Sequence, residues 1–202
     1  MPLHNAASDS WYYVKHMRDQ ILEEVQQIIP FDELEQSHVE DVISWISGTN
    51  DIFRIAKPDN PPKHLVSYFV VYDPNTQKIL LIDHIKANAW LPSGGHVETG
   101  EHPRDTVVRE AEEELELHAR FDVMGEVPVF ITVTQTRGHG THTDVSLWYV
   151  ISGDSTVTHR YDANEMRGYR WLKFDEILAM DEQLLDPHMK RFVHKFTKAT
   201  RA

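Results

Sequence analysis

The sequence of 202 residues predicts an α+β fold, an α/β/α sandwich with a mixed β-sheet, preceded by an N-terminal helical extension. Three observations support this prediction. Apolar residues recur at helical spacing in the first quarter of the chain, and runs of β-branched and aromatic residues typical of strands begin at residue 64. Helices and strands then follow one another without a regular βαβ alternation, which disfavours a doubly wound parallel sheet.

The N-terminal segment, residues 1–56, is predicted to form two helices. Pro30 ends the first, and in the second Ser37 and Glu40 form a capping box while Gly48 follows the last turn. The apolar stripe of the second helix consists of Val39, Val42, Ile43 and Ile46. Because both stripes hold ordinary core residues, we expect a packing layer or a homodimer interface rather than a lid over a substrate.

A proline-rich connector, "KPDNPPK", opens the second segment, residues 57–202. Strands over 64–73 and 78–85 form a predicted hairpin across the turn residues "DPNTQ". An acidic helix follows from Pro103. The remaining predicted elements are strands over 127–136, 144–151 and 169–174, a short helix over 174–180 and a C-terminal helix from Pro187.

Composition excludes several classes of function. With 32 acidic and 20 basic residues, the formal net charge of −12 disfavours sequence-independent binding to nucleic acid and to an anionic membrane. The lack of cysteine excludes disulfides, thiolate zinc sites and cysteine nucleophiles. No apolar run approaches the roughly 20 residues that span a bilayer, and residues 1–10 lack the pattern of a signal peptide. We therefore expect a cytoplasmic protein.

The predicted helix "PRDTVVREAEEEL" is unusually acidic. Pro103 suits its first position, and His102 precedes it as the N-cap. Glu110 lies three and four residues before Glu113 and Glu114, so the three carboxylates project from one side and are expected to converge on one point. The buried stripe beside them is predicted to contain Val107, Val108, Ala111 and Leu115. A hard cation such as Mg²⁺ would remove the repulsion; the alternative is a solvated acidic face.

The stretch from Gly95 to Leu117 resembles the Nudix box, the signature of the Nudix hydrolase superfamily. That signature requires a glycine, a glutamate and the run "RE..EE" at fixed spacing, and all of them are present. The matching positions are Gly95, Glu101, Arg109, Glu110, Glu113 and Glu114. Glu116 departs from the signature, because it replaces a glycine whose left-handed conformation often ends the helix.

The resemblance implies that residues 57–202 form a Nudix hydrolase domain. Its implied substrate is a small molecule, a nucleoside diphosphate linked to another moiety, with water attacking phosphorus and Mg²⁺ or Mn²⁺ as cofactor. The implied metal ligands are Glu110, Glu113, Glu114 and the backbone carbonyl of Gly94. Arg109 is implied to hold Glu101, and Glu113 or Glu114 is a candidate general base.

Further candidates lie outside the box. Glu165 is the outside candidate for the general base, with an ordinary surface glutamate as the alternative. Arg137, His139 and His142 are candidates for phosphate contact, and Trp90 for stacking on a base. A catalytically idle Nudix-like ligand-binding module is the alternative function. Sugar nucleotides, dinucleoside polyphosphates, oxidised nucleotides and non-nucleotide diphosphates all stay open as substrates.

Overall fold

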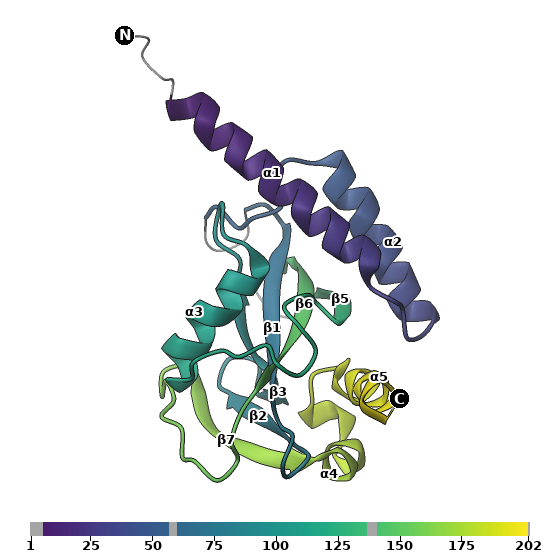
Figure 1. The fold of residues 1–202 in the computed structure, drawn as a ribbon, viewed down its shortest axis with the longest axis vertical. Coiled ribbons are helices and arrows are strands. Elements are labelled where there is room, and N and C mark those ends of the chain that lie inside the picture. Colours follow the sequence, from purple (N-terminus) through teal and green to yellow (C-terminus); the bar gives the residue numbers. More distant parts are fainter. Residues whose placement is uncertain (1–5, 57–59, 137–140, 202) are drawn as a thin grey trace.

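The computed structural model describes residues 6–56, 60–136 and 141–201 (Figure 1). Within them, seven strands form one mixed sheet, in which β4 and β7 pair outside the main path β3-β2-β1-β6-β5. The central strand β1 is parallel to β6 and antiparallel to β2 and β4. The strands are β1 (Lys63–Asp73), β2 (Lys78–His84), β3 (Ala89–Leu91), β4 (Ser93–His96), β5 (Phe130–Gln135), β6 (Thr143–Ser152) and β7 (Met166–Lys173).

Helices cover both faces of this sheet. The first face carries α1 (Ala6–Gln27), α2 (Glu33–Gly48) and α3 (Pro103–Leu115), and the second carries α4 (Phe174–Ala179) and α5 (Met189–Arg201). Side chains along β1 alternate accordingly: Phe69 and Val71 enter the first core, whereas Val70 and Tyr72 enter the second. The predicted α/β/α sandwich with an N-terminal helical extension is confirmed.

The N-terminal helices share the first core with the sheet. Ile21 and Val25 of α1 and Val42 and Ile46 of α2 are fully buried, and Figure 1 shows both helices lying across one end of the sheet. Packing thus accounts for their apolar stripes, whereas the homodimer and the division at residue 57 stay predictions. None of the described helices is long and apolar enough to cross a membrane.

Helix α2 begins earlier than the sequence analysis predicted. Asp32 is its N-cap, and the carboxylate accepts a hydrogen bond from the amide of Glu35 at 2.8 Å. Ser37 and Glu40 therefore lie inside the helix, and the predicted capping box is wrong. Gly48 is the last helical residue rather than the residue that follows the helix.

The C-terminal helix begins later than predicted, at Met189 instead of Pro187. The carboxylate of Asp186 accepts a hydrogen bond from the amide of His188 at 2.8 Å, so a local turn precedes the helix. The inward-facing residues are buried as their spacing indicates, namely Met189, Phe192, Val193 and Phe196. Two short strands, β3 and β4, were not predicted.

Helix α2 also closes the outer edge of β5 with a buried ionic contact. The fully buried carboxylate of Glu35 accepts hydrogen bonds from the Ile131 amide of β5 at 3.3 Å and from Lys195 Nζ of α5 at 2.7 Å. Nearby, Asp32 Oδ2 lies 2.8 Å from Arg191 Nε, and this hydrogen bond lowers the pKa of Asp32 to about 2. The N-terminal helices are therefore joined to the C-terminal helix.

We expect Glu35→Gln to reduce the free energy of unfolding by about 1–3 kcal/mol, because Lys195 would keep its charge without a carboxylate partner. Chemical denaturation measures this loss. Glu33→Gln is the matched control, since Glu33 is an exposed residue in the first turn of the same helix. Equal losses in the two variants would contradict a stabilising role for this contact.

Candidate active site

The acidic helix α3 lies against the first core beside β4. Val107, Ala111 and Leu115 are fully buried, but Val108 is 40% exposed, so its predicted place in the buried stripe is wrong. Each residue turns about 100° around a helix, which carries position 108 away from the sheet. Glu114 is buried instead, with only 5% exposure. A potentially charged group thus lies where an apolar side chain would ordinarily pack.

Both ends of α3 are closed by residues uncommon at such positions. As predicted, His102 is the N-cap, and its Nδ1 accepts a hydrogen bond from the Arg104 amide at 3.1 Å. Glu116 adopts the left-handed conformation, with φ 47° and ψ 40°. Its amide and that of Leu117 donate to carbonyl oxygens of the last turn, so the helix ends as it would with glycine.

Glu116→Gly is therefore expected to raise the free energy of unfolding by about 0.5–1 kcal/mol, because glycine adopts this conformation without a Cβ clash. For a domain of this size the melting temperature would rise by about 1–4 °C. Glu116→Ala removes the same carboxylate but keeps the strain, and so serves as the control in thermal unfolding. A melting temperature of Glu116→Gly at or below that of the alanine variant would show that strain is not the cause.

Arg109 connects the loop before α3 to the helix itself. Its Nε and Nη2 donate to the two carboxylate oxygens of Glu101 at 2.9 and 3.0 Å, a bidentate pair. Nη1 contacts Glu110 at 2.7 Å and Glu113 at 3.3 Å, and Nη2 also donates to the His96 carbonyl at 3.3 Å. The contact between Arg109 and Glu101 that the resemblance implies is present.

The carboxylates of Glu110, Glu113 and Glu114 do not lie close enough to share one ion in their described positions. The first two contact the arginine, while Ser93 of β4 donates a hydrogen bond to Glu114. In these positions Glu110 and Glu113 face the arginine and Glu114 faces Ser93, and the convergence of the three carboxylates on one cation stays a prediction. Burial raises the pKa of Glu114 to about 8; the hydrogen bond from Ser93 opposes this rise, and the charges of Glu110 and Glu165 add to it.

Strand β4 brings its glycine backbone against this helix. A Cβ at Gly95 would lie 1.9 Å from Glu110 Oε1, and one at Gly94 would lie 2.2 Å from the Ser67 carbonyl oxygen. Pairing of Gly94 with Tyr68 of β1 fixes the strand. Gly95, the first matching position of the Nudix box, belongs to β4. The absence of a side chain at these positions allows the carboxylate to approach the backbone.

Glu165 lies beside the acidic helix. The loop before β7 is bound to α3, since the amide of Asp162 donates to the Glu114 carbonyl at 3.1 Å, and the Glu165 carbonyl accepts from the Ile85 amide at 2.8 Å. Burial is the main cause that raises the pKa of Glu110, and the negative charges of Glu113 and Glu165 raise it further. The outside candidate for the general base is thus close to the box.

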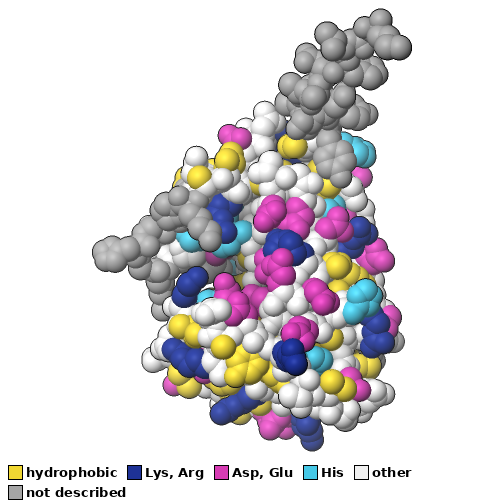
Figure 2. Space-filling model, turned by 90° about the vertical axis from the view of Figure 1, so that its left-hand side faces the viewer, with side chains coloured by type: hydrophobic (Ala, Val, Ile, Leu, Met, Phe, Trp, Pro, Cys, Tyr) yellow, Lys and Arg dark blue, Asp and Glu magenta, His cyan; other side chains and the backbone are white. Residues whose placement is uncertain are grey.

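These residues suit a hard divalent cation. The candidate donors are all oxygen atoms, and two of the glutamates are largely buried: the side chain of Glu110 is 14% exposed, and Glu114 as a whole residue is 5% exposed. Arg109 contacts both Glu110 and Glu113, so an added cation would reduce the repulsion that one guanidinium leaves among the acidic groups. Figure 2, which looks onto the face that carries α3, shows acidic side chains gathered around basic ones, with histidines beside them.

Other predicted residues are distributed differently. Arg137 and His139 lie outside the described residues. Trp90, in β3, is half-buried against the second core, with the Arg170 guanidinium 4.8 Å from the centre of its ring. Trp90 therefore packs against the core, as most aromatic residues in strands do. This is the alternative to stacking on a base.

His142 belongs to a group that the sequence analysis missed. It lies with His64, His96 and Asp144, and its Nε2 is 3.1 Å from Asp144 Oδ1. Burial, followed by the positive charge of Arg54, lowers the pKa of His96 to about 3. The parallel register of β1 and β6 sets His64 opposite Asp144, and no local pattern in the sequence indicates this pairing.

Fold and site together define a class of α/β/α protein with a carboxylate-bearing helix next to a glycine-containing strand. A sequence model described as the NUDIX domain matches residues 62–196. The chain therefore belongs to the Nudix family of hydrolases. Among curated proteins, a search finds no match to this sequence.

Several solved structures share the fold. The E. coli dihydroneopterin triphosphate pyrophosphohydrolase is similar with 16% identity and a TM-score of 0.55, over 73% of this chain and 98% of that one. A NUDIX-family hydrolase from Clostridium perfringens has 19% identity and a TM-score of 0.52, over 68% and 97%. A C. elegans Ap4A hydrolase has 15% identity and a TM-score of 0.52, again over 68% and 97%. Identities this low establish the fold alone.

Proposed function

We propose that this chain hydrolyses the diphosphate linkage of a nucleoside diphosphate joined to another moiety, as a cytoplasmic enzyme that uses Mg²⁺ or Mn²⁺. The observation that carries the proposal is the complete acidic array on α3, with Glu114 buried in spite of its potential charge. A protein that only bound a ligand would gain stability by losing these charges. The names of two similar structures, a pyrophosphohydrolase and an Ap4A hydrolase, support the reaction class.

Each part of the site has a proposed role. The ligands of the cation would be Glu110, Glu113, Glu114 and the carbonyl of Gly94. When bound, the cation would offset the charge of the diphosphate and acidify the attacking water. Arg109 and Glu101 fix the loop against α3 and so orient these donors. Ser93 orients Glu114 through its hydrogen bond.

The proton of the attacking water requires an acceptor. Glu113, Glu114 and Glu165 are the candidates, and each is a carboxylate on or next to the acidic helix. Glu113 is the most accessible of the candidates on the helix, with 60% side-chain exposure. A carboxylate that binds the cation is less basic than one outside its shell, which favours Glu165 for this role.

A panel of sugar nucleotides, dinucleoside polyphosphates, oxidised nucleotides and non-nucleotide diphosphates, incubated in ¹⁸O-labelled water with Mg²⁺ or Mn²⁺, tests the reaction. We expect metal-dependent release of a labelled phosphorylated product by the wild type and its loss in Glu113→Gln. Glu112→Gln, which changes an exposed glutamate of the same helix, should keep the activity. Tight, metal-independent binding without turnover would instead establish the ligand-binding module.

Glu165→Gln is expected to lower kcat by about 10²–10⁴-fold and to remove the acidic limb of the pH–rate profile, because the variant has no carboxylate to accept the proton. KM should change little. The control is Glu126→Gln, at an exposed glutamate bonded to Arg104. An unchanged pH profile in Glu165→Gln would assign the base to the acidic helix.

A further inference from the structure

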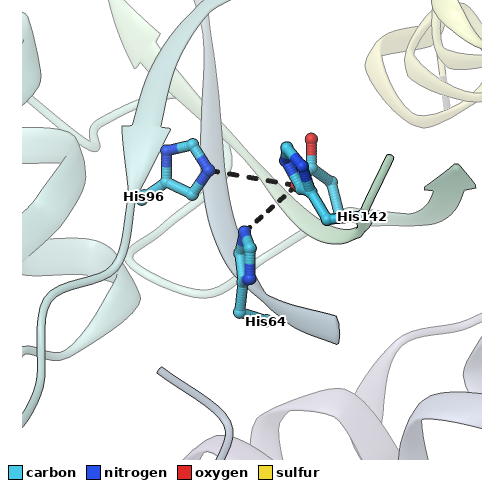
Figure 3. Close-up of side chains that lie close together, drawn as sticks. His64, His96 and His142 are labelled. Atoms are coloured by element: carbon cyan, nitrogen blue, oxygen red, sulfur yellow. Dashed lines mark ion pairs between the residues drawn. The ribbon is translucent and has the colours of Figure 1, made fainter. Parts of the chain in front are cut away.

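Four ligand-type side chains meet at one point, and only His96 among them belongs to the Nudix box. We call them the His3Asp cluster: His64, His96, His142 and Asp144. One ligand atom of each lies within 4.8 Å of all the others. The Nε2 atoms of His142, His64 and His96 are 3.1, 3.5 and 4.0 Å from the same oxygen, Asp144 Oδ1. Figure 3 shows the three rings facing one another.

Strand pairing builds this cluster. His64 near the start of β1 lies opposite Asp144 of β6 in the parallel register, and His142 immediately precedes β6. His96 ends β4, the neighbour of β1 on its other edge. The centre of the His64 ring is 4.9 Å from the centres of both other rings. Strands β1, β4 and β6 therefore hold these side chains in place, with His142 one residue before β6.

The hydrogen bond of His64 determines which of its nitrogens faces the cluster. Nδ1 lies 2.8 Å from the Pro61 carbonyl oxygen, which only accepts, so Nδ1 carries the ring proton. In the neutral form of this ring, the lone pair of Nε2 is directed toward Asp144 Oδ1. Both atoms are buried and have no hydrogen-bond partner among the described residues, and His64 is fully buried. Two buried acceptors that face each other are unfavourable unless a cation lies between them.

A single proton does not resolve this arrangement, because all three rings face one carboxylate oxygen. One divalent cation can accept lone pairs from the three imidazoles and the carboxylate together. We propose that the His3Asp cluster is a binding site for a divalent cation of the Zn²⁺ class, separate from the hard-cation site of α3. Metal–ligand bonds of about 2.0–2.1 Å place tetrahedral ligands about 3.3 Å apart, and the separations from Asp144 bracket this distance.

The surroundings of the ligands agree with such a site. The Pro61 carbonyl holds Nδ1 of His64, and Thr136 Oγ1 lies 3.3 Å from Nδ1 of His142, so two rings are oriented by partners at their other nitrogen. Three nitrogen donors and one oxygen suit Zn²⁺, Co²⁺ or Ni²⁺ better than Mg²⁺, which takes oxygen ligands.

Arg54 is a competitor for this site. Its Nη1 lies 3.1 Å from His96 Nε2, the lone pair that a cation at the cluster would use. A bound cation must displace this contact. Replacing the arginine while keeping all four ligands should therefore strengthen binding, an effect that a purely structural histidine cluster would not show.

The proposed role of the cation is structural. Four protein ligands leave no open position for a substrate, as is typical of structural zinc sites. The cation would join β1, β4 and β6 at one end of the sheet. It would also hold the backbone of His96, whose carbonyl accepts a hydrogen bond from Arg109. The cluster would thereby stabilise the strand that supports the acidic helix.

Titration of the chelator-treated full chain with Co²⁺ and Zn²⁺, in the presence of Mg²⁺, tests the proposal. We expect one tight equivalent, the intense visible absorption of tetrahedral Co²⁺ and a higher melting temperature with Zn²⁺. Affinity should fall about 100-fold or more in Asp144→Asn and His142→Asn. It should be unchanged in His118→Asn, an exposed histidine elsewhere, and in Glu114→Gln, and should rise in Arg54→Gln.

Circular dichroism establishes that the variants fold, and Asp144→Asn preserves the size of the side chain. Equal Co²⁺ affinity in the wild type and Asp144→Asn would overturn the proposal, because the carboxylate would not be a ligand. Loss of the tight equivalent in Glu114→Gln would assign it to α3. An absorption spectrum of octahedral Co²⁺, absence of tight binding, or weaker binding in Arg54→Gln would also contradict a site at the cluster.

Discussion

Glu114→Gln is expected to lower the hydrolase activity by about 10²-fold or more and, in the presence of a chelator, to stabilise the protein. Both effects follow from the position of Glu114, which is 5% exposed and has a pKa raised by burial to about 8. Glutamine keeps the shape and can retain the contact with Ser93, but it carries no charge to desolvate. The free energy of unfolding should rise by about 1–3 kcal/mol.

Glu112→Gln is the matched control for this prediction, because Glu112 is an exposed carboxylate on the same helix. Its free energy of unfolding should stay within about 0.5 kcal/mol of the wild-type value, and its activity within a few-fold of the wild type. Denaturation with chelator, followed by kinetics with Mg²⁺, separates the two effects. If Glu114→Gln destabilises the protein in the presence of chelator, Glu114 stabilises the fold. The buried carboxylate would then not cost stability in the absence of a cation.

The parts of the site that are local in sequence were predictable. The spacing from Gly95 to Glu114 encodes a turn, a helix start and a row of carboxylates, all within one stretch of chain. The contact between Arg109 and Glu101 was implied by the resemblance of this stretch to the Nudix box. Strands β1 and β2 were likewise predictable, because a short turn joins them and fixes their antiparallel pairing.

Features that depend on pairing between distant segments were not predictable. Strand β4 has the sequence "SGGH", whose glycines disfavour a strand, and it is held by its register with β1. The His3Asp cluster requires the parallel pairing of β1 with β6, which nothing in the local pattern specifies. The contact of Glu35 with Lys195 joins residues that are 160 positions apart. Side-chain direction set a further limit, as Glu114 turned toward Ser93.

Arg109→Met is expected to reduce both stability and activity. The bidentate pair with Glu101 is mostly shielded, with side-chain exposures of 27% and 16%. Removing the arginine takes away the cationic partner that the carboxylates of Glu101 and Glu110 have among the described residues. We expect the free energy of unfolding to fall by about 2–4 kcal/mol, less than for a fully buried pair because water still reaches the guanidinium. Urea denaturation measures this change.

Arg104→Met on the same helix is the control. Arg104 also pairs with two carboxylates, those of Asp105 and Glu126, but its side chain is 39% exposed and theirs 54% and 65%. Its removal should cost at most about 1 kcal/mol. Equal losses in the two methionine variants would mean that the helix responds to its net charge and not to the specific pair at Glu101.

Arg109→Lys separates charge from geometry. Lysine keeps the positive charge near Glu101, but a single ammonium group cannot make two parallel hydrogen bonds while also reaching Glu110. Stability should therefore recover in part, whereas kcat should stay well below that of the wild type, because the loop before α3 loses its fixed orientation. Full recovery of kcat by lysine would show that the site requires only a cation at this position, and that the orientation of the loop does not limit the reaction.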